Sequence, residues 1–189
     1  MRPEQRVALR TQRLLLEPFA RGHAQEVTPV IGHPLVADTT SNIPHPYTER
    51  DATGFAEAIE SSAGGLHCWL LRTRGARAIV GGVGLHGFEG DAAEFGYWIG
   101  VDHWGNGYAT EALVALLGHA FATLGLARLH ACYFARNPAS KRVMEKAGCT
   151  PREHGACPPF IEKNGVRERV GWMEMTRERW ARQGTGGGA

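Results

Sequence analysis

Residues 104–112, Trp104-Gly105-Asn106-Gly107-Tyr108-Ala109-Thr110-Glu111-Ala112, decide how this chain folds. They follow an apolar run from Phe95 to Val101 and lead into a long amphipathic segment. The pattern predicts a strand that turns through two glycines into the first turn of a helix. The first N–H groups of a helix lack internal partners and, with the helix dipole, attract an anion, which glycine lets approach closely. We interpret the stretch as a pyrophosphate cradle; the alternative is a helix start that binds nothing.

Composition indicates an ordinary globular chain. It has 189 residues, of which 43% are hydrophobic and 21% charged, and its formal net charge is +2. This charge gives no sign of nucleic acid or a lipid surface, and no apolar run reaches the roughly 18 residues of a membrane span. We expect one domain over residues 1–182, a disordered glycine-rich tail over 183–189, a cytoplasmic location, and no nucleic-acid or membrane partner.

The four cysteines are scattered, at Cys68, Cys132, Cys149 and Cys157. Such scatter favours reduced thiols over a disulfide framework. Cys149, His154 and Cys157 could begin a zinc site, but a fourth ligand at sensible spacing is missing, so no metal is predicted.

Hydrophobic periodicity predicts strands that alternate with helices. Strands are expected over residues 14–16, 67–73, 78–85, 92–101, 128–134 and 170–175, and helices over 23–31, 48–61, 110–124 and 137–147. The two prolines of segment 42–47 indicate an irregular loop. Hairpins come first, and a strand–helix–strand–helix unit with a parallel strand pair follows. The fold class is therefore a mixed, mostly antiparallel α/β sheet with helices packed on it.

A formal G-x-G-x-x-G occurs at Gly82, Gly84 and Gly87. A dinucleotide site would need a helix after it, whereas Phe88-Glu89-Gly90-Asp91 is typical of a hairpin. We interpret these glycines as a thin or bulged strand.

Glu94 is the candidate general base. On an extended strand it shares a face with Gly96, Trp98 and Gly100, while Phe95, Tyr97, Ile99 and Val101 form the core face. Two glycines on a central strand leave a groove, and a carboxylate in a partly buried groove has a raised pKa. A solvated glutamate at the start of a strand is the alternative.

The segment Asn137-Pro138-Ala139-Ser140 begins a helix that follows the neighbouring parallel strand. Helix capping alone would explain Asn137. Its place at the carboxyl end of a parallel strand, where α/β sheets bind ligands, makes it a candidate site across the cleft from Gly107.

Residues 104–112, preceded by Glu94-Phe95-Gly96-Tyr97-Trp98-Ile99, resemble the acetyl-CoA motif of the GNAT superfamily of N-acetyltransferases. The similarity is closest to the branch of ribosomal-protein N-terminal-alanine acetyltransferases. Residues 9–16, 44–52, 136–148 and 164–180 also resemble that branch, so the resemblance spans nearly the whole chain.

The resemblance implies helices on both faces of the sheet and a splayed strand pair that holds pantetheine. It assigns acetyl-CoA as cosubstrate to residues Ile99, Gly100, Val101, Trp104, Gly105, Asn106, Gly107, Tyr108, Ala109, Thr110, Asn137 and Ser140. Glu94 would be the base and Ser140 the acid. Tyr47, His86, Phe88 and Trp98 would shape the amine pocket.

Two positions depart from the superfamily pattern. Trp104 stands where Gln or Arg is usual, as is normal for this branch, and Met144 replaces the usual tyrosine acid. The expected activity is direct acetyl transfer to a primary amine, with a protein N-terminal α-amine as the leading acceptor. Alternatives are a small-molecule acetyltransferase for an antibiotic, polyamine or amino acid, a non-catalytic acyl-CoA sensor, and a protein that binds another anion at the loop. A monomer or a homodimer fits equally.

Overall fold

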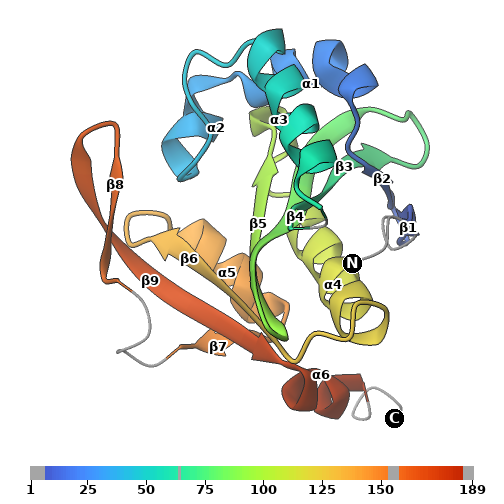
Figure 1. The fold of residues 1–189 in the computed structure, drawn as a ribbon, viewed down its shortest axis with the longest axis vertical. Coiled ribbons are helices and arrows are strands. Elements are labelled where there is room, and N and C mark those ends of the chain that lie inside the picture. The colour runs from blue at the N-terminus through green and yellow to red at the C-terminus, as the bar shows by residue number, and fades with distance from the viewer. Residues whose placement is uncertain (1–6, 64, 153–157, 185–189) are drawn as a thin grey trace.

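A long twisted sheet forms the centre of the fold (Figure 1). The computed structural model describes residues 7–63, 65–152 and 158–184. The strands are β1 (Leu9–Arg10), β2 (Leu14–Pro18), β3 (His67–Thr73), β4 (Ile79–Glu89), β5 (Ala92–Ile99), β6 (Arg128–Phe134), β7 (Thr150–Pro151), β8 (Phe160–Lys163) and β9 (Val166–Thr176). They follow the order β1-β2-β3-β4-β5-β6-β9-β7, and β8 pairs with β9. Only β5 and β6 pair in parallel among these strands, which confirms the predicted mixed sheet.

The helices are α1 (Ala24–Ile31), α2 (Pro34–Thr39), α3 (Glu49–Ser61), α4 (Tyr108–Ala122), α5 (Pro138–Lys146) and α6 (Arg177–Gly184), with 3-10 turns η2 (Arg21–His23) and η3 (Val101–His103). Among the described residues, no helix combines the length and the apolar character that crossing a bilayer requires.

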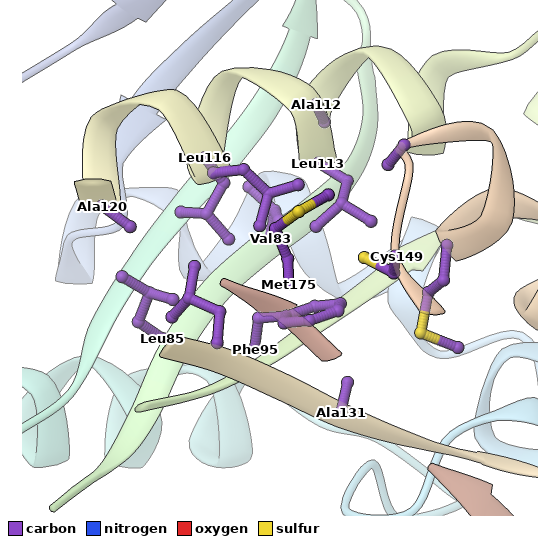
Figure 2. Close-up of a cluster of buried hydrophobic side chains, with 14 of the residues drawn as sticks. Val83, Leu85, Phe95, Ala112, Leu113, Leu116, Ala120, Ala131, Cys149 and Met175 are labelled. Atoms are coloured by element: carbon purple, nitrogen blue, oxygen red, sulfur yellow. The ribbon is translucent and has the colours of Figure 1, made fainter. Parts of the chain in front are cut away.

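Two hydrophobic clusters cover the two faces of the sheet. On one face, Leu113 and Leu116 of α4 pack over Val83, Leu85 and Phe95 (Figure 2). On the other face, α1, α2 and α3 bury their apolar sides against the sheet, in a cluster of Ala24, Val27, Ile31, Val36, Ala52, Leu70 and Ile79. Alternate residues of β3 therefore enter opposite cores, as the period of two requires, and helices lie on both faces.

The parallel pair β5–β6 parts after three residues. Ala92, Ala93 and Glu94 pair with residues 128–130, and no pairing with β6 follows. Beyond Glu94, β5 continues to Ile99 paired only with β4, while β6 continues to Phe134 paired with β9. The expected splay is therefore present, and it opens toward the start of α4.

Local sequence sets the helix starts. The Oγ1 of Thr48 accepts from the N–H of Asp51, and Asp51 Oδ2 accepts from the N–H of Thr48 at 2.8 Å, which is a capping box. Pro138 occupies the first turn of α5, and Asn137 Oδ1 accepts from the Ser140 N–H at 3.1 Å.

Several elements differ from the sequence predictions: the strand expected over residues 92–101 ends at Ile99, and Val101 begins η3. Helix α2 was not expected. Strand β4 extends to Glu89 through an irregular register at Gly87, whose φ is +57°, which confirms a bulged strand for the glycine motif. Helix α6 includes Gln183 and Gly184, two residues into the predicted tail, and residues 185–189 lie outside the described ones.

Candidate active site

The start of α4 presents bare backbone N–H groups to a cavity. Gly105 and Gly107 both have φ of +78°, a left-handed conformation that glycine adopts without strain. Gly107 is the N-cap residue, and among the described residues no side chain caps it. These groups therefore keep the donor capacity that suits an anion.

This cavity, of about 370 Å³, brings together most of the predicted cofactor residues. They are Ile99, Trp104, Gly105, Gly107, Tyr108, Ala109, Thr110, Asn137 and Ser140. We call it the helix-start cavity.

Three predicted cofactor residues do not line this cavity. Gly100 ends the strand, where its N–H donates to Val80 O at 3.0 Å. Val101 packs against the cluster beneath α1–α3. The side chain of Asn106 shapes the loop by donating to the carbonyl oxygens of His103 and Trp104, both at 3.2 Å.

Arg13, which the sequence analysis missed, supports the same loop from the bend just before β2. Its Nε donates to Glu111 Oε2 at 2.6 Å, its Nη1 donates to Asn106 O at 2.9 Å, and its guanidinium lies 4.9 Å from the centre of the Tyr108 ring. Partial burial raises the pKa of Glu111, but hydrogen bonds from Thr11 and Arg13 outweigh this effect and lower it. Glu111 therefore stays ionised and fixes Arg13 beneath the loop.

The free edge of β5 faces the gap between the parted strands. Because the Gly100 N–H points to β4, the N–H and C=O groups of Ile99 and Tyr97 point the opposite way, into the gap. The indole N–H of Trp104 donates to Ile99 O at 2.7 Å. A ligand that pairs with this edge would meet Trp104 first.

A second cavity of about 800 Å³ lies on the α1–α3 side of β5, and its lining includes Glu94, His86, Trp98 and Tyr47. We call it the large cavity. Phe88 does not line either cavity; its ring lies 5.4 Å from that of His67. The two cavities share five lining residues, namely Thr39, Thr40, Tyr97, Trp98 and Ser140. The two cavities therefore lie side by side.

Glu94 sits between two histidines. It pairs across the sheet with His86 on β4 and with His130 on β6, so the three side chains share a face. Burial raises the pKa of Glu94, and the charge of His86 opposes the rise. Burial lowers the pKa of His130, whose buried Nδ1 has no hydrogen-bond partner among the described residues. This environment moves the pKa of Glu94 toward the range in which general bases work.

Tyr97 joins the strand edge to α5. The sequence placed it on the core face, and it does pack against that core. Its hydroxyl, however, lies 2.9 Å from both Ser140 Oγ and Ser140 O and reaches the wall of both cavities. Asn137 caps α5, and its Nδ2 also approaches Thr39 O at 3.4 Å.

Metal ligands do not gather in the described part of the chain. No group of three or more His, Cys, Asp or Glu side chains there is arranged to hold an ion. His154 and Cys157, two members of the zinc set considered from the sequence, lie outside the described residues.

Comparison with known proteins identifies the family. Residues 13–150 match the family model described as "Acetyltransferase (GNAT) domain". The chain therefore belongs to the GNAT acetyltransferase family.

A curated relative is the uncharacterized N-acetyltransferase YoaA of Bacillus subtilis, 32% identical over 100 residues, which cover 52% of this chain and 55% of that protein. The chain thus spans about half the length of the curated relatives it matches first.

Solved structures show the same fold. RimL, the ribosomal L7/L12 α-N-protein acetyltransferase, in complex with coenzyme A has a TM-score of 0.78 and 17% identity, over 90% of this chain and 98% of that one. Spermidine N-acetyltransferase from Vibrio cholerae, with CoA and spermine, has a TM-score of 0.76 and 17% identity, over 90% of this chain and 99% of that one.

Proposed function

We propose that this protein transfers the acetyl group of acetyl-CoA directly to a primary amine. The observation that carries the proposal is the junction of the two cavities. One ends at the uncapped start of α4, the other contains a half-buried carboxylate, and they meet at Tyr97, Trp98 and Ser140.

The residues present fit coenzyme A. The N–H groups at residues 105–110 suit its pyrophosphate, and the free edge of β5 at Ile99 suits its pantetheine amides, which can pair as an added strand. The β5 edge and the loop that would hold coenzyme A are shaped by Gly100, Val101 and Asn106. When bound, acetyl-CoA supplies an acetyl group activated as a thioester. RimL and the spermidine enzyme, whose structures contain coenzyme A, share this fold.

Glu94 is the proposed base. An amine must lose its proton to attack, which at pH 7 costs roughly 1.4 kcal/mol for an α-amine with a pKa near 8 and about 4.6 kcal/mol for a lysine near 10.4. A single carboxylate with a raised pKa suits the smaller cost. The backbone N–H of Ile99 then stabilises negative charge on the carbonyl oxygen, and Ser140 protonates the departing thiolate.

Direct transfer is favoured because burial keeps Cys68, a thiol that lines the large cavity, protonated. Burial raises the pKa of Cys68 to about 12, and it likewise raises the pKa of Cys149 to about 12. A neutral thiol is a poor nucleophile, so neither of these two cysteines supports an acetyl-cysteine intermediate.

The finer proposal is that the acceptor is a protein N-terminal α-amine, as the name of the ribosomal L7/L12 α-N-protein acetyltransferase RimL states for that enzyme. A small-molecule amine is the second candidate, and a non-catalytic acyl-CoA sensor is the third. The proposed location is the cytoplasm, where acetyl-CoA and protein amines are both present.

The test is to incubate the purified protein with acetyl-CoA and a panel of amines, following thiol release and identifying products by mass spectrometry. Acetylated amine together with released thiol supports the proposal. Calorimetry with coenzyme A, ATP and NAD is the control that shows which of these ligands the protein binds. Binding of ATP or NAD without coenzyme A would refute acetyl transfer, and coenzyme A binding without turnover of any amine would indicate a sensor.

A further inference from the structure

The large cavity has mostly apolar walls. Its volume of about 800 Å³ lies within the range of about 300–1,000 Å³ for small-molecule sites. Its apolar lining includes Phe19, Val27, Ile31, Ile43, Tyr47, Phe55, Leu66, Leu70, Trp98 and Phe134. Such walls stabilise a carbon skeleton and leave polar atoms without partners.

Few charges face the cavity. Among its described lining residues, the Asp, Glu, Lys and Arg side chains are Arg50, Asp51 and Glu94. The carboxylate of Asp51 already accepts from the N–H and the Oγ1 of Thr48, at 2.8 and 2.6 Å, and Arg50 offsets its charge. Both contacts use Oδ2 and belong to the cap of α3, so Asp51 attracts an ammonium group less than Glu94, for which no such side-chain hydrogen bond is present among the described residues.

The acidic residues beside the cavity are also engaged. Asp38 of α2 and Glu168 of β9 both pair with Arg136, at 2.8 and 3.1 Å. Lys163 donates to the carbonyl oxygens of Ala37 and Thr40 and ties β8 to the same segment. These contacts hold one wall in place, so that among the described lining residues Asp51, which caps the start of α3, is the one carboxylate at a distance from Glu94.

The floor of the cavity is bare at Gly96. A Cβ there would lie 3.9 Å from its nearest neighbour, His86 Nε2, which is an ordinary contact. At Gly82 and Gly84, by contrast, a Cβ would meet Trp98 Nε1 and Cys68 Sγ at 2.5 Å. The open space thus lies beside His86, two residues from Glu94, where the carbon chain of an amine would rest.

We infer that the acceptor is a primary monoamine with an apolar body, and that polyamines are poor substrates. This inference rests on the proposed acetyl transfer and narrows its acceptor. The ammonium group lies at Glu94, which takes its proton, and the body lies along the Gly96 floor against the aromatic walls. Further ammonium groups of a polyamine would meet only Asp51, which Thr48 and Arg50 already engage, so their desolvation would be poorly compensated.

The experiment compares kcat/KM for phenethylamine, a tripeptide that begins with Phe, a tripeptide that begins with Asp, and spermidine. We expect phenethylamine or the Phe tripeptide to exceed both the Asp tripeptide and spermidine at least about tenfold. The comparison of phenethylamine with the Phe tripeptide distinguishes a free amine from a peptide N-terminus as the acceptor. Equal or higher kcat/KM for spermidine or for the Asp tripeptide would overturn the inference.

Two variants test the cavity itself. Gly96→Ala adds a methyl group to the floor of the cavity, so KM for phenethylamine should rise about fivefold while KM for ethylamine stays the same. The matched control is Gly75→Ala, which lies in a remote turn with open space around it. Phe55→Glu places a carboxylate at the exposed rim and should raise kcat/KM for spermidine about fivefold, whereas Phe55→Gln should not. Unchanged values in both Gly96→Ala and Phe55→Glu would contradict the inference.

Failure of the inference is distinguishable from failure of the proposed function. If coenzyme A binds by calorimetry and spermidine is the better substrate, only the acceptor class is wrong. If coenzyme A does not bind, acetyl transfer itself is refuted.

Discussion

The hydroxyl oxygen of Tyr97 lies 2.9 Å from Ser140 Oγ, where the two cavities share a wall. Burial raises the pKa of Tyr97, so its hydroxyl remains protonated and donates. Ser140 O, also at 2.9 Å, accepts equally well. Tyr97 therefore positions Ser140 and leaves the serine proton available to a leaving thiolate.

If Ser140 delivers that proton, Ser140→Ala should lower kcat about 10²-fold, at the lower end of general-acid contributions. Tyr97→Phe removes only the positioning contact and should lower kcat less, roughly tenfold at most. Steady-state kinetics and calorimetry with coenzyme A, whose Kd should change little, provide the measurement. Ser61→Ala on α3 is the matched control. A Ser140→Ala enzyme within twofold of wild type would show that Ser140 is not the acid.

The dependence of kcat on pH should follow the ionisation of Glu94. The base works only when ionised, so kcat rises with pH through its pKa, and burial places that rise above the usual carboxyl range. His86→Gln removes the charge that opposes the shift, so the rise in kcat should move to higher pH. Profiles of kcat from pH 4 to 8 are the measurement. Glu94→Gln should abolish the rise; activity within a few-fold of wild type at pH 7 would exclude Glu94 as the base.

Local patterns predicted much of the fold and the site. The 3.6-residue period of α4, the Thr48 cap and the Asn137-Pro138 start are short-range signals, and each was confirmed. The period of two on β5 placed Glu94, Gly96 and Trp98 on one face, and all three line the large cavity.

Long-range or irregular features could not be predicted in this way. The period of two gave the face of Tyr97 but not the reach of its hydroxyl to α5. The bulge at Gly87 interrupts the alternation of β4, because an extra residue changes which face follows, and Phe88 packs against the core on the α4 side. Arg13 and Glu111 are 98 residues apart, so only the fold brings them together.

The Arg13–Glu111 pair should contribute to stability as well as to the loop. Glu111→Gln removes the charge that accepts from Thr11 and Arg13, so the free energy of unfolding should fall by about 1–2 kcal/mol. For a chain of this size, the Tm should fall by about 2–8 °C. Thermal unfolding is the measurement, and Glu57→Gln, which breaks the exposed pair with Arg21, should change the Tm by no more than about 2 °C. Because the pair also supports Asn106, coenzyme A should bind about threefold or more weakly; an unchanged Tm and Kd would refute this role.

Trp104 should respond directly to coenzyme A. Its indole N–H occupies Ile99 O, the carbonyl that faces the gap and is proposed to pair with pantetheine. Binding must therefore release the indole, and tryptophan emission should change on titration with coenzyme A. Trp104→Phe should lose most of that change, whereas Trp98→Phe should retain it.

Trp104→Phe also leaves Ile99 O free before binding, so the Kd for coenzyme A should tighten about 2–10-fold, the equivalent of one net hydrogen bond. If Trp104→Phe instead keeps the full emission change, the pantetheine arm does not use that carbonyl and lies elsewhere in the gap.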